Sequence, residues 1–390
     1  METPKLGHVG YAALCCACLS SCSLEAQLRL NELQFLGTHN SYHIEPEPAV
    51  LAAIAAIDPQ TARTLEYTER PLEEQLDQGV RQLELDIYSD PEGGHYSNRA
   101  GLLALGRDPR SGIAALDEPG LKVLHIQDLD FQSHCLTFRE CLSQLEHWSS
   151  AHPYHLPIMV MVEPKQDPIP DPLHLGFVVP LPFDAAAVDG IDAEIRSVFE
   201  ASRLITPDEV RERSATLEQA VLAGNWPSVA ESRGRMLFTF LNRGTARELY
   251  AQSHPSLEGR VMFVDSDRGQ PDAAFFSRDS ALIDGAEIDA LVRAGYLVRT
   301  RADIDTLQAR SGDHRLQDAA FASGGQFVST DYVVPDPRFG SYSAALPGGF
   351  VARCNPLTAP PGCDSERLSA LDGLDPEHAR LLARSGLPAR

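Results

Sequence analysis

The segment 35–43 begins as an apolar run and ends in a glycine followed by small polar residues. This order is typical of a buried strand that delivers His39 and Asn40 to the loop at its C-terminal end. A histidine there can transfer a proton or stabilise negative charge, and the amide oxygen beside it suits a hard cation. A polar turn without chemistry is the other interpretation of this pair taken alone.

Two carboxylates, Glu84 and Asp86, lie two positions apart in the β-type run 80–87. Because strand side chains alternate, both carboxylates face the same side. On the inward face of a barrel strand, two anions would repel each other unless a cation lay between them. With Asn40 they form an oxygen-only ligand set, which favours Ca²⁺, with Mg²⁺ as second choice, over zinc. The other interpretation is an edge strand whose polar face lies in water.

Two further β-type runs carry polar groups near their ends. We expect His125, in the run 122–126, at the same rim as His39, although a lone histidine is also typical of a satisfied core residue. The run 157–162 is followed by Glu163 and Lys165, again two positions apart. Glu163 is the expected fourth metal oxygen, and Lys165 is a cation suited to a phosphate or a sugar hydroxyl.

For these groups to form one site, the strands that carry them must end close to one another. Eight β-type runs recur along the chain, and most are followed by a segment with helical periodicity. This alternation predicts an α/β fold with a parallel sheet covered by helices, and the count of eight predicts a (β/α)8 TIM-type barrel. The predicted strands are 33–36, 80–87, 122–126, 157–162, 236–241, 260–264, 296–300 and 326–332. The predicted helices include 72–78, 138–148, 189–200, 245–252, 283–294 and 306–323.

We expect one catalytic domain over residues 30–335 and a disulfide-pinned C-terminal extension over 336–390. The segments 89–120 and 166–182 are rich in Pro, with Gly and charge in the first, and should form long loops at the strand ends. Such loops shape access to a barrel's site.

Residues 1–22 have the pattern of an export leader. Lys5 gives a weak positive start, a short apolar run follows, and Leu19-Ser-Ser-Cys22 has the order of a bacterial lipoprotein signal with Cys22 as the lipidation site. The run is too short to span a bilayer. We therefore expect an exported protein, either a membrane-anchored lipoprotein or secreted or periplasmic. A cytosolic N-terminal tail is the alternative.

Four cysteines remain beyond this leader, an even number at short spacings that suits an oxidising compartment. The simplest pairing joins Cys135 to Cys141 and Cys354 to Cys363. The capping-box spacing of Thr137-Phe-Arg-Glu140 would place Cys141 in the first turn of a helix, within reach of Cys135. Zinc binding is the rival, but neither pair has Cys-x-x-Cys spacing.

The net charge of −22 argues against general affinity for nucleic acid or an anionic lipid surface, since both are polyanions. A locally positive or metal-bridged pocket remains compatible with it. Nothing in the sequence implies a protein partner, and we expect a monomer.

Taken together, these motifs resemble the phosphatidylinositol-specific phospholipase C superfamily, a branch of the PLC-like phosphodiesterases. The motif sequences Gly37-Thr-His-Asn-Ser-Tyr-His43 and Leu83-Glu-Leu-Asp-Ile87 are most similar to those of its bacterial calcium-dependent branch. Three later segments also match: 300–305, 322–332 and 346–356. The resemblance covers nearly everything from residue 33 to 363.

By this resemblance, His39 and His125 correspond to the two catalytic imidazoles, and the calcium ligands correspond to Asn40, Glu84, Asp86 and Glu163. The implied reaction is attack of the inositol 2-hydroxyl on phosphorus, which expels diacylglycerol and leaves a cyclic or hydrolysed inositol phosphate. The implied partner is a phospholipid at a membrane surface.

Groups from the later strands could line the substrate pocket: Arg243, Asp265, Arg301 and Tyr332. An ordinary salt bridge or core role is an equal alternative for each. Two other functions stay open on the same fold. One is a hydrolase of glycerophosphodiesters, which shares the barrel and a Glu-x-Asp metal pair, and the other is a non-catalytic surface lipoprotein.

Overall fold

A computed structural model describes residues 25–372. Eight parallel strands pair in the ring order β7-β6-β4-β2-β1-β10-β9-β8. A parallel bridge between Asp265 and Phe275 joins β7 to β8, and this bridge closes the barrel. The ring strands are β1 (Leu33–Thr38), β2 (Gln82–Tyr88), β4 (Ile158–Pro164), β6 (Met236–Phe240), β7 (Met262–Val264), β8 (Phe275–Ser277), β9 (Leu297–Arg301) and β10 (Phe327–Thr330).

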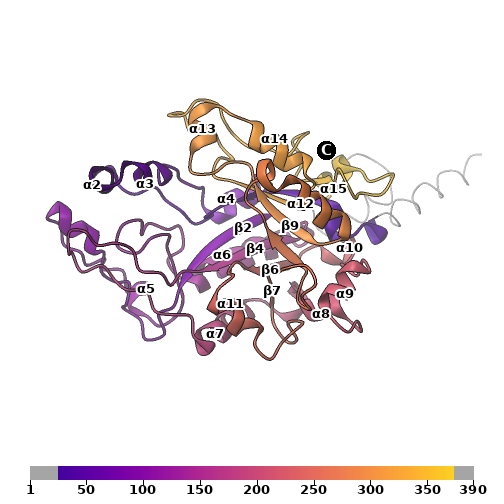
Figure 1. Ribbon diagram of the computed structural model, residues 1–390, viewed down its shortest axis with the longest axis horizontal. Coiled ribbons are helices and arrows are strands. Elements are labelled where there is room, and N and C mark those ends of the chain that lie inside the picture. The colour runs from indigo at the N-terminus through magenta and orange to yellow at the C-terminus, as the bar shows by residue number, and fades with distance from the viewer. Residues whose placement is uncertain (1–24, 373–390) are drawn as a thin grey trace, which may run out of the picture.

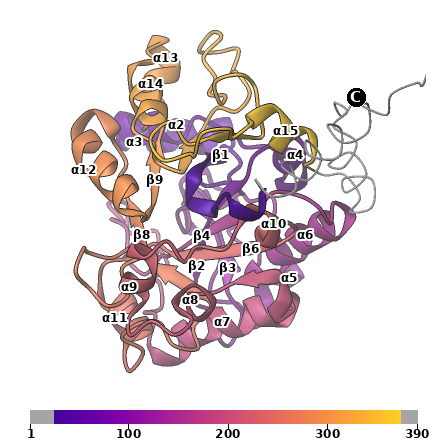
Figure 2. The same ribbon diagram turned by 90° about the vertical axis from the view of Figure 1, so that its right-hand side faces the viewer.

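Helices surround these strands (Figure 2) and bury their apolar faces against them. Several helices begin at a residue whose side chain accepts a backbone N–H, as Thr137 does at α6 and Asp184 at α7. The covering helices are α4 (Leu72–Asp77), α6 (Phe138–Ala151), α7 (Ala185–Val198), α8 (Pro207–Arg211), α9 (Leu217–Leu222), α10 (Val229–Ser232), α11 (Thr245–Ala251), α12 (Ala281–Ala294), α13 (Leu307–Ser311) and α14 (Arg315–Ala322).

The predicted barrel is confirmed, but one predicted strand is wrong. The segment 122–126 holds only β3 (Lys122–Val123), which pairs antiparallel with the end of β2. It cannot belong to the parallel ring, because a parallel neighbour of β2 would need a crossover that returns the chain to the other end of the sheet. The eighth ring strand is instead β8, which the sequence prediction missed. The prediction also joined α13 and α14, which Gly312 separates with a φ of 65°.

The seam between β1 and β2 is narrow, with a single paired register between Gly37 and Gln82. The side chain of Gln82 fills the space over Gly37, and a Cβ built on Gly37 would lie 1.9 Å from Gln82 Oε1. Gln82 Nε2 donates to Thr38 O at 3.1 Å. Just beyond, Ser41 N donates to Glu84 O at 2.9 Å and Glu84 N donates to Ser41 Oγ at 2.8 Å. Side-chain packing therefore sets the relative position of these two strands.

An insertion between β1 and β2 stands away from the barrel, on the same side as α5 (Ala114–Asp117) (Figure 1). It contains α2 (Pro48–Ile57) and α3 (Pro59–Thr64) and packs on the short helix η2 (Ala100–Leu105). These elements share a small apolar core that is separate from the barrel core.

After the ring, the chain adds β11 (Ala352–Cys354) antiparallel to β1, followed by α15 (Ser365–Ala370). Two other short helices are η1 (Leu30–Glu32) and η3 (Ala201–Arg203), and β5 (Leu204–Ile205) extends β6. Both predicted disulfides are confirmed, Cys135 with Cys141 and Cys354 with Cys363. Within residues 25–372, no helix combines the length and apolar character needed to cross a bilayer. The predicted leader, with Cys22, lies outside the described residues.

Candidate active site and metal centre

Three carboxylates converge where β2 and β4 end. Glu84 and Asp86 come from β2, Glu163 comes from β4, and the three oxygens that they offer lie within 4.8 Å of one another. The convergence follows from register, because Asp86 and Glu163 are direct partners in the parallel pairing of these strands. Glu84 and Asp86 are buried, whereas Glu163 is partly exposed. The predicted carboxylate cluster therefore exists at one rim of the barrel.

Asn40 adds an amide oxygen from the β1 side of the same rim. Its backbone has a φ of 46°, a left-handed conformation that Asn tolerates better than most residues. Asn40 Nδ2 donates to Tyr67 Oη at 2.9 Å, which orients the amide. Asn40 Oδ1 is buried and has no hydrogen-bond partner among residues 25–372. A buried acceptor left unpaired is costly, so this oxygen and the carboxylates fit a hard cation such as Ca²⁺.

Burial changes the acidity of this cluster. It raises the pKa of Glu84 to about 7, with the charge of Glu163 adding to the rise and Arg299 opposing it. Burial likewise raises the pKa of Asp86 well above its usual value, and Lys165 opposes that rise. Positive charge in the cluster therefore stabilises the ionised carboxylates, as a metal ion would.

Two basic side chains already pair with these acids. Lys165 Nζ lies 3.1 Å from Asp86 Oδ2 and 2.9 Å from Glu163 Oε1. Arg299 donates to Glu84 Oε2 at 2.9 Å from across the barrel. Lys165 thus lies at the site as predicted, while its role toward a substrate stays a prediction.

His39 lies beside the cluster and is oriented by a distant residue. Its Nδ1 is 2.8 Å from Asp331 Oδ1, and its Nε2 faces Glu84 Oε1 at 3.9 Å. Arg301 donates to the other oxygen of Asp331 at 3.1 Å. Burial lowers the pKa of His39 well below its usual value, and the charges of Arg301 and Arg299 lower it further. Arg301 therefore joins the site through Asp331.

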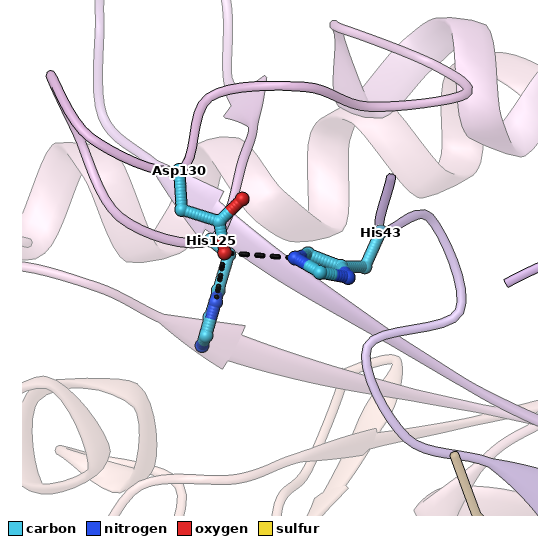
Figure 3. A group of neighbouring side chains, drawn as sticks. All are labelled: His43, His125 and Asp130. Carbon is cyan, nitrogen blue, oxygen red and sulfur yellow. Dashed lines mark hydrogen bonds and ion pairs between the residues drawn. The ribbon is translucent and has the colours of Figure 1, made fainter. Parts of the chain in front are cut away.

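His125 is held in a different way, by a carboxylate in its own loop (Figure 3). Its Nδ1 and the Nε2 of His43 both lie 2.7 Å from the same oxygen, Asp130 Oδ2. Tyr88 Oη donates to the backbone carbonyl of His125 at 2.9 Å. Burial lowers the pKa of His125, whereas the hydrogen bond and charge of Asp130 raise it. With Nδ1 committed to Asp130, Nε2 of His125 is free to exchange a proton with a ligand.

His125 also lies near the carboxylate rim. Its charge lowers the pKa of His39, and that of Lys165 lowers the pKa of His125, effects that require proximity. The structure thus brings the three predicted carboxylates together beside His39, while the roles of these residues, of Asn40 and of His125 stay predictions.

The remaining predicted pocket residues are placed differently. Arg243 Nε donates to Asp265 Oδ2 at 2.6 Å, and Arg243 also binds Asp267, so this pair forms a loop ion-pair network. Tyr332 is buried and packs with Tyr342 in a small aromatic cluster. These contacts match the structural alternative for Arg243, Asp265 and Tyr332, and their substrate role stays a prediction.

The sequence interpretation assigned no role to four residues that organise the site: His43, Asp130, Arg299 and Asp331. Two had a detectable signal, because Asp130 follows His125 by five positions and Arg299 alternates with Arg301 on one strand face. Asp331 lies in the matching segment 322–332, but its pairing with His39 depends on the pairing of β10 with β1, which are far apart in sequence.

Solved structures support the barrel. The chain is similar to a Ca²⁺-dependent phosphatidylinositol-specific phospholipase C from Streptomyces antibioticus, with 19% identity and a TM-score of 0.50 over 78% of this chain and 95% of that one. It is also similar to a calcium-dependent phosphoinositol-specific phospholipase C from Pseudomonas sp. in its myoinositol complex, with 16% identity and a TM-score of 0.50 over 85% and 97%. At these identities the likeness shows a shared fold. A search of the curated proteins found no match.

A family match extends over most of the chain. The profile of the family described as "Phosphoinositide phospholipase C, Ca2+-dependent" matches residues 28–356. This span contains both imidazoles and every residue of the carboxylate cluster. The chain therefore belongs to the calcium-dependent phosphoinositide phospholipase C family, whose members are phosphoric diester hydrolases.

Proposed function

We propose that this protein is a calcium-dependent phosphodiesterase that cleaves phosphatidylinositol or a close relative. The products are diacylglycerol and an inositol phosphate, cyclic or hydrolysed. The observation that supports the proposal is the convergence of three carboxylates at one barrel rim, with two carboxylate-oriented imidazoles and the unpaired amide oxygen of Asn40 on the adjoining loops. The calcium dependence in the family description supports the choice of ion.

The proposed metal ligands are Asn40, Glu84, Asp86 and Glu163. When bound, Ca²⁺ would polarise the phosphoryl oxygen and lower the pKa of the attacking inositol 2-hydroxyl. The hydroxyl oxygen forms a bond to phosphorus, and a carboxylate of the ligand set accepts its proton. His39, oriented by Asp331, faces the phosphoryl oxygens on which negative charge develops.

His125 completes the reaction by protonating the leaving group. The bond between phosphorus and the glycerol oxygen breaks, and Nε2 of His125 donates a proton to the departing oxygen. Asp130 orients the ring and stabilises its protonated form. Lys165 pairs with Asp86 and Glu163, and with calcium bound to those carboxylates its ammonium group would contact the phosphate or an inositol hydroxyl.

The first test is turnover of phosphatidylinositol by the purified full chain. We expect products that disappear in EGTA and return with Ca²⁺. Glycerophosphoinositol and glycerophosphocholine should be poorer substrates. Faster turnover of either soluble diester would identify a glycerophosphodiesterase, and no turnover of any diester would favour a non-catalytic surface protein.

A second test replaces a ligand. Glu84→Gln removes one charge from the ligand set and should weaken calcium binding, as measured by a higher Ca²⁺ concentration for half-maximal turnover. Glu200→Gln, on an exposed turn, is the matched control and should match the unsubstituted protein. An unchanged calcium requirement in Glu84→Gln would contradict the ligand set.

We further infer that the protein works as a monomer outside the cytosol, where its two disulfides are stable. Anchoring through Cys22 would keep it at a membrane that supplies the lipid. Mass spectrometry of the mature N-terminus tests the anchor: diacylation at Cys22 supports it, and an unmodified residue 22 contradicts it.

A further inference from the structure

A cavity of about 370 Å³ lies beside the proposed active site, beneath the insertion between β1 and β2. Its walls are formed by α2 and α3, the region of η2, the loop 126–129 and the loop 169–177 that follows β4. Its lining is almost entirely apolar.

The two lining carboxylates are committed to the backbone. Asp58 caps α3 by accepting from Gln60 N and Thr61 N. Asp171 accepts from three successive backbone amides of its own loop, those of residues 175–177. The cavity therefore offers little to a polar ligand and suits an apolar one.

The walls are also tied to one another. Asp128 accepts from Ala100 N at 2.7 Å through one oxygen and from Val178 N at 2.7 Å through the other. This single carboxylate therefore joins the η2 region to the loop after β4. The small core of α2, α3 and Phe131 supports the remaining side. The cavity is thus built into the fold.

The cavity shares a loop with the proposed active site, and this indicates which part of the substrate would bind in it. Its residues Ile126 and Leu129 belong to the short loop that carries His125 and Asp130. A backbone bridge between Ile126 and Asp130 fixes this loop. His125 protonates the leaving oxygen in the proposed reaction, so the leaving group must lie next to this loop. For phosphatidylinositol, the leaving group is diacylglycerol.

We propose that this cavity binds one acyl chain of the diacylglycerol portion of the substrate. The inference rests on the proposed function and adds the recognition of the lipid tail. At about 30 Å³ for a group the size of a water molecule, the cavity holds roughly ten chain carbons. Ile57 and Leu173, at its lining, are 55% and 52% exposed, so they present apolar surface to a lipid chain that approaches from solvent or a bilayer.

The test compares two substitutions on the same helix. Ala53→Phe fills the cavity, because Ala53 lines it. Ala52→Phe places the same side chain on an exposed position that does not line it, and is the matched control. Both changes carry the same helix propensity cost, so their difference reports the cavity.

Kinetics use phosphatidylinositols with acyl chains of four to eight carbons, below their micelle concentrations. In the unsubstituted protein and in Ala52→Phe, kcat/KM should rise by up to about fourfold per buried methylene. In Ala53→Phe that rise should be lost. The proposal would be overturned if kcat/KM did not depend on acyl-chain length in any of the three proteins, or if both variants lost the dependence equally. Either result would indicate that the protein contacts the lipid only at the bilayer surface.

Binding of dihexanoylglycerol, measured by calorimetry, needs neither calcium nor turnover. The unsubstituted protein and Ala52→Phe should bind it, and Ala53→Phe should not. Such binding without turnover of any phosphatidylinositol would contradict the proposed function but support binding of an acyl chain in the cavity. If turnover depends on calcium but dihexanoylglycerol binding is undetectable, or is equal in all three proteins, the proposed function holds and acyl-chain binding in the cavity is contradicted.

Discussion

The two histidines of the site are positioned by different parts of the molecule. His39 follows a barrel strand, and Asp331, from the end of another ring strand, fixes its ring. His125 lies in a loop after β3, where Asp130 fixes it together with His43. The first arrangement depends on the pairing of β1 with β10, and the second on a local loop next to a disulfide.

This difference separates the proposed roles. A histidine held by the barrel rim keeps a constant distance to the carboxylate cluster, which suits a group that faces phosphorus. A histidine on a separate loop can lie on the leaving-group side, next to the apolar cavity. The comparison predicts that the two histidines and their carboxylates respond differently to substitution, and that only the disulfide next to the His125 loop affects turnover.

The largest expected effect is that of His125→Ala. Loss of the general acid should reduce turnover of phosphatidylinositol by about 10²- to 10⁴-fold. An inositol phosphate ester with a nitrophenol leaving group needs no proton, so its turnover should fall much less. His39→Ala should lower both rates by similar factors, since its role does not depend on the leaving group.

The exposed His147→Ala is the control and should leave both rates unchanged. Equal losses on the two esters in His125→Ala would argue against an acid role. Calcium binding, measured by calorimetry, should persist in His125→Ala.

A smaller effect is expected from the two orienting carboxylates. Asp130→Asn and Asp331→Asn should each slow turnover by about 10- to 100-fold, the worth of a hydrogen bond to a charged group. Only Asp130→Asn should also move the pH profile. The charge of Asp130 raises the pKa of His125 against the lowering by burial, so its loss lowers that pKa.

The sign of the pH shift follows from the acid role. His125 must be protonated to act, so activity falls as pH rises through its pKa. In Asp130→Asn the alkaline limb of kcat/KM should therefore move to lower pH. An alkaline limb that stays in place in Asp130→Asn, or moves equally in Asp331→Asn, would contradict the assignment.

The smallest effect concerns the disulfides. Replacing both cysteines of either pair with Ser should lower the free energy of unfolding by about 2–3 kcal/mol, given loops of 6 and 9 residues. The pair Cys135 and Cys141 follows the loop of His125, so its loss should also reduce turnover. Loss of the Cys354 pair should leave the rate of folded protein unchanged. Denaturant unfolding measures the free energy of unfolding, and assays at the same temperature measure turnover. Equal rate losses in the two variants would contradict a role of the Cys135–Cys141 disulfide in positioning the His125 loop.

Much of the fold was predictable because apolar runs alternate with amphipathic helices. The errors have physical causes. The run 122–126 is apolar like a ring strand, yet only its first two residues pair, and they pair antiparallel. β8 has three residues, too few for a periodic pattern.

The carboxylate cluster was also predictable, because the C-terminal ends of parallel strands meet at one edge of a barrel. Partners distant in sequence were not. Asp331 follows β10, which pairs with β1, and so reaches His39 over 292 positions, while Arg299 of β9 reaches Glu84 from across the barrel over 215 positions. Sequence order alone does not encode which side chains face one another across a barrel.

The narrow seam at Gly37 gives this geometry a weak point. Asn40 lies on one side of the seam and Glu84 on the other, while Gln82 occupies the space that a side chain at Gly37 would need. A methyl added there would collide with Gln82 and disturb the pairing of the two strands. Substitution of Gly37, which is not itself a proposed ligand, would therefore displace Asn40 relative to Glu84 and weaken the proposed calcium site.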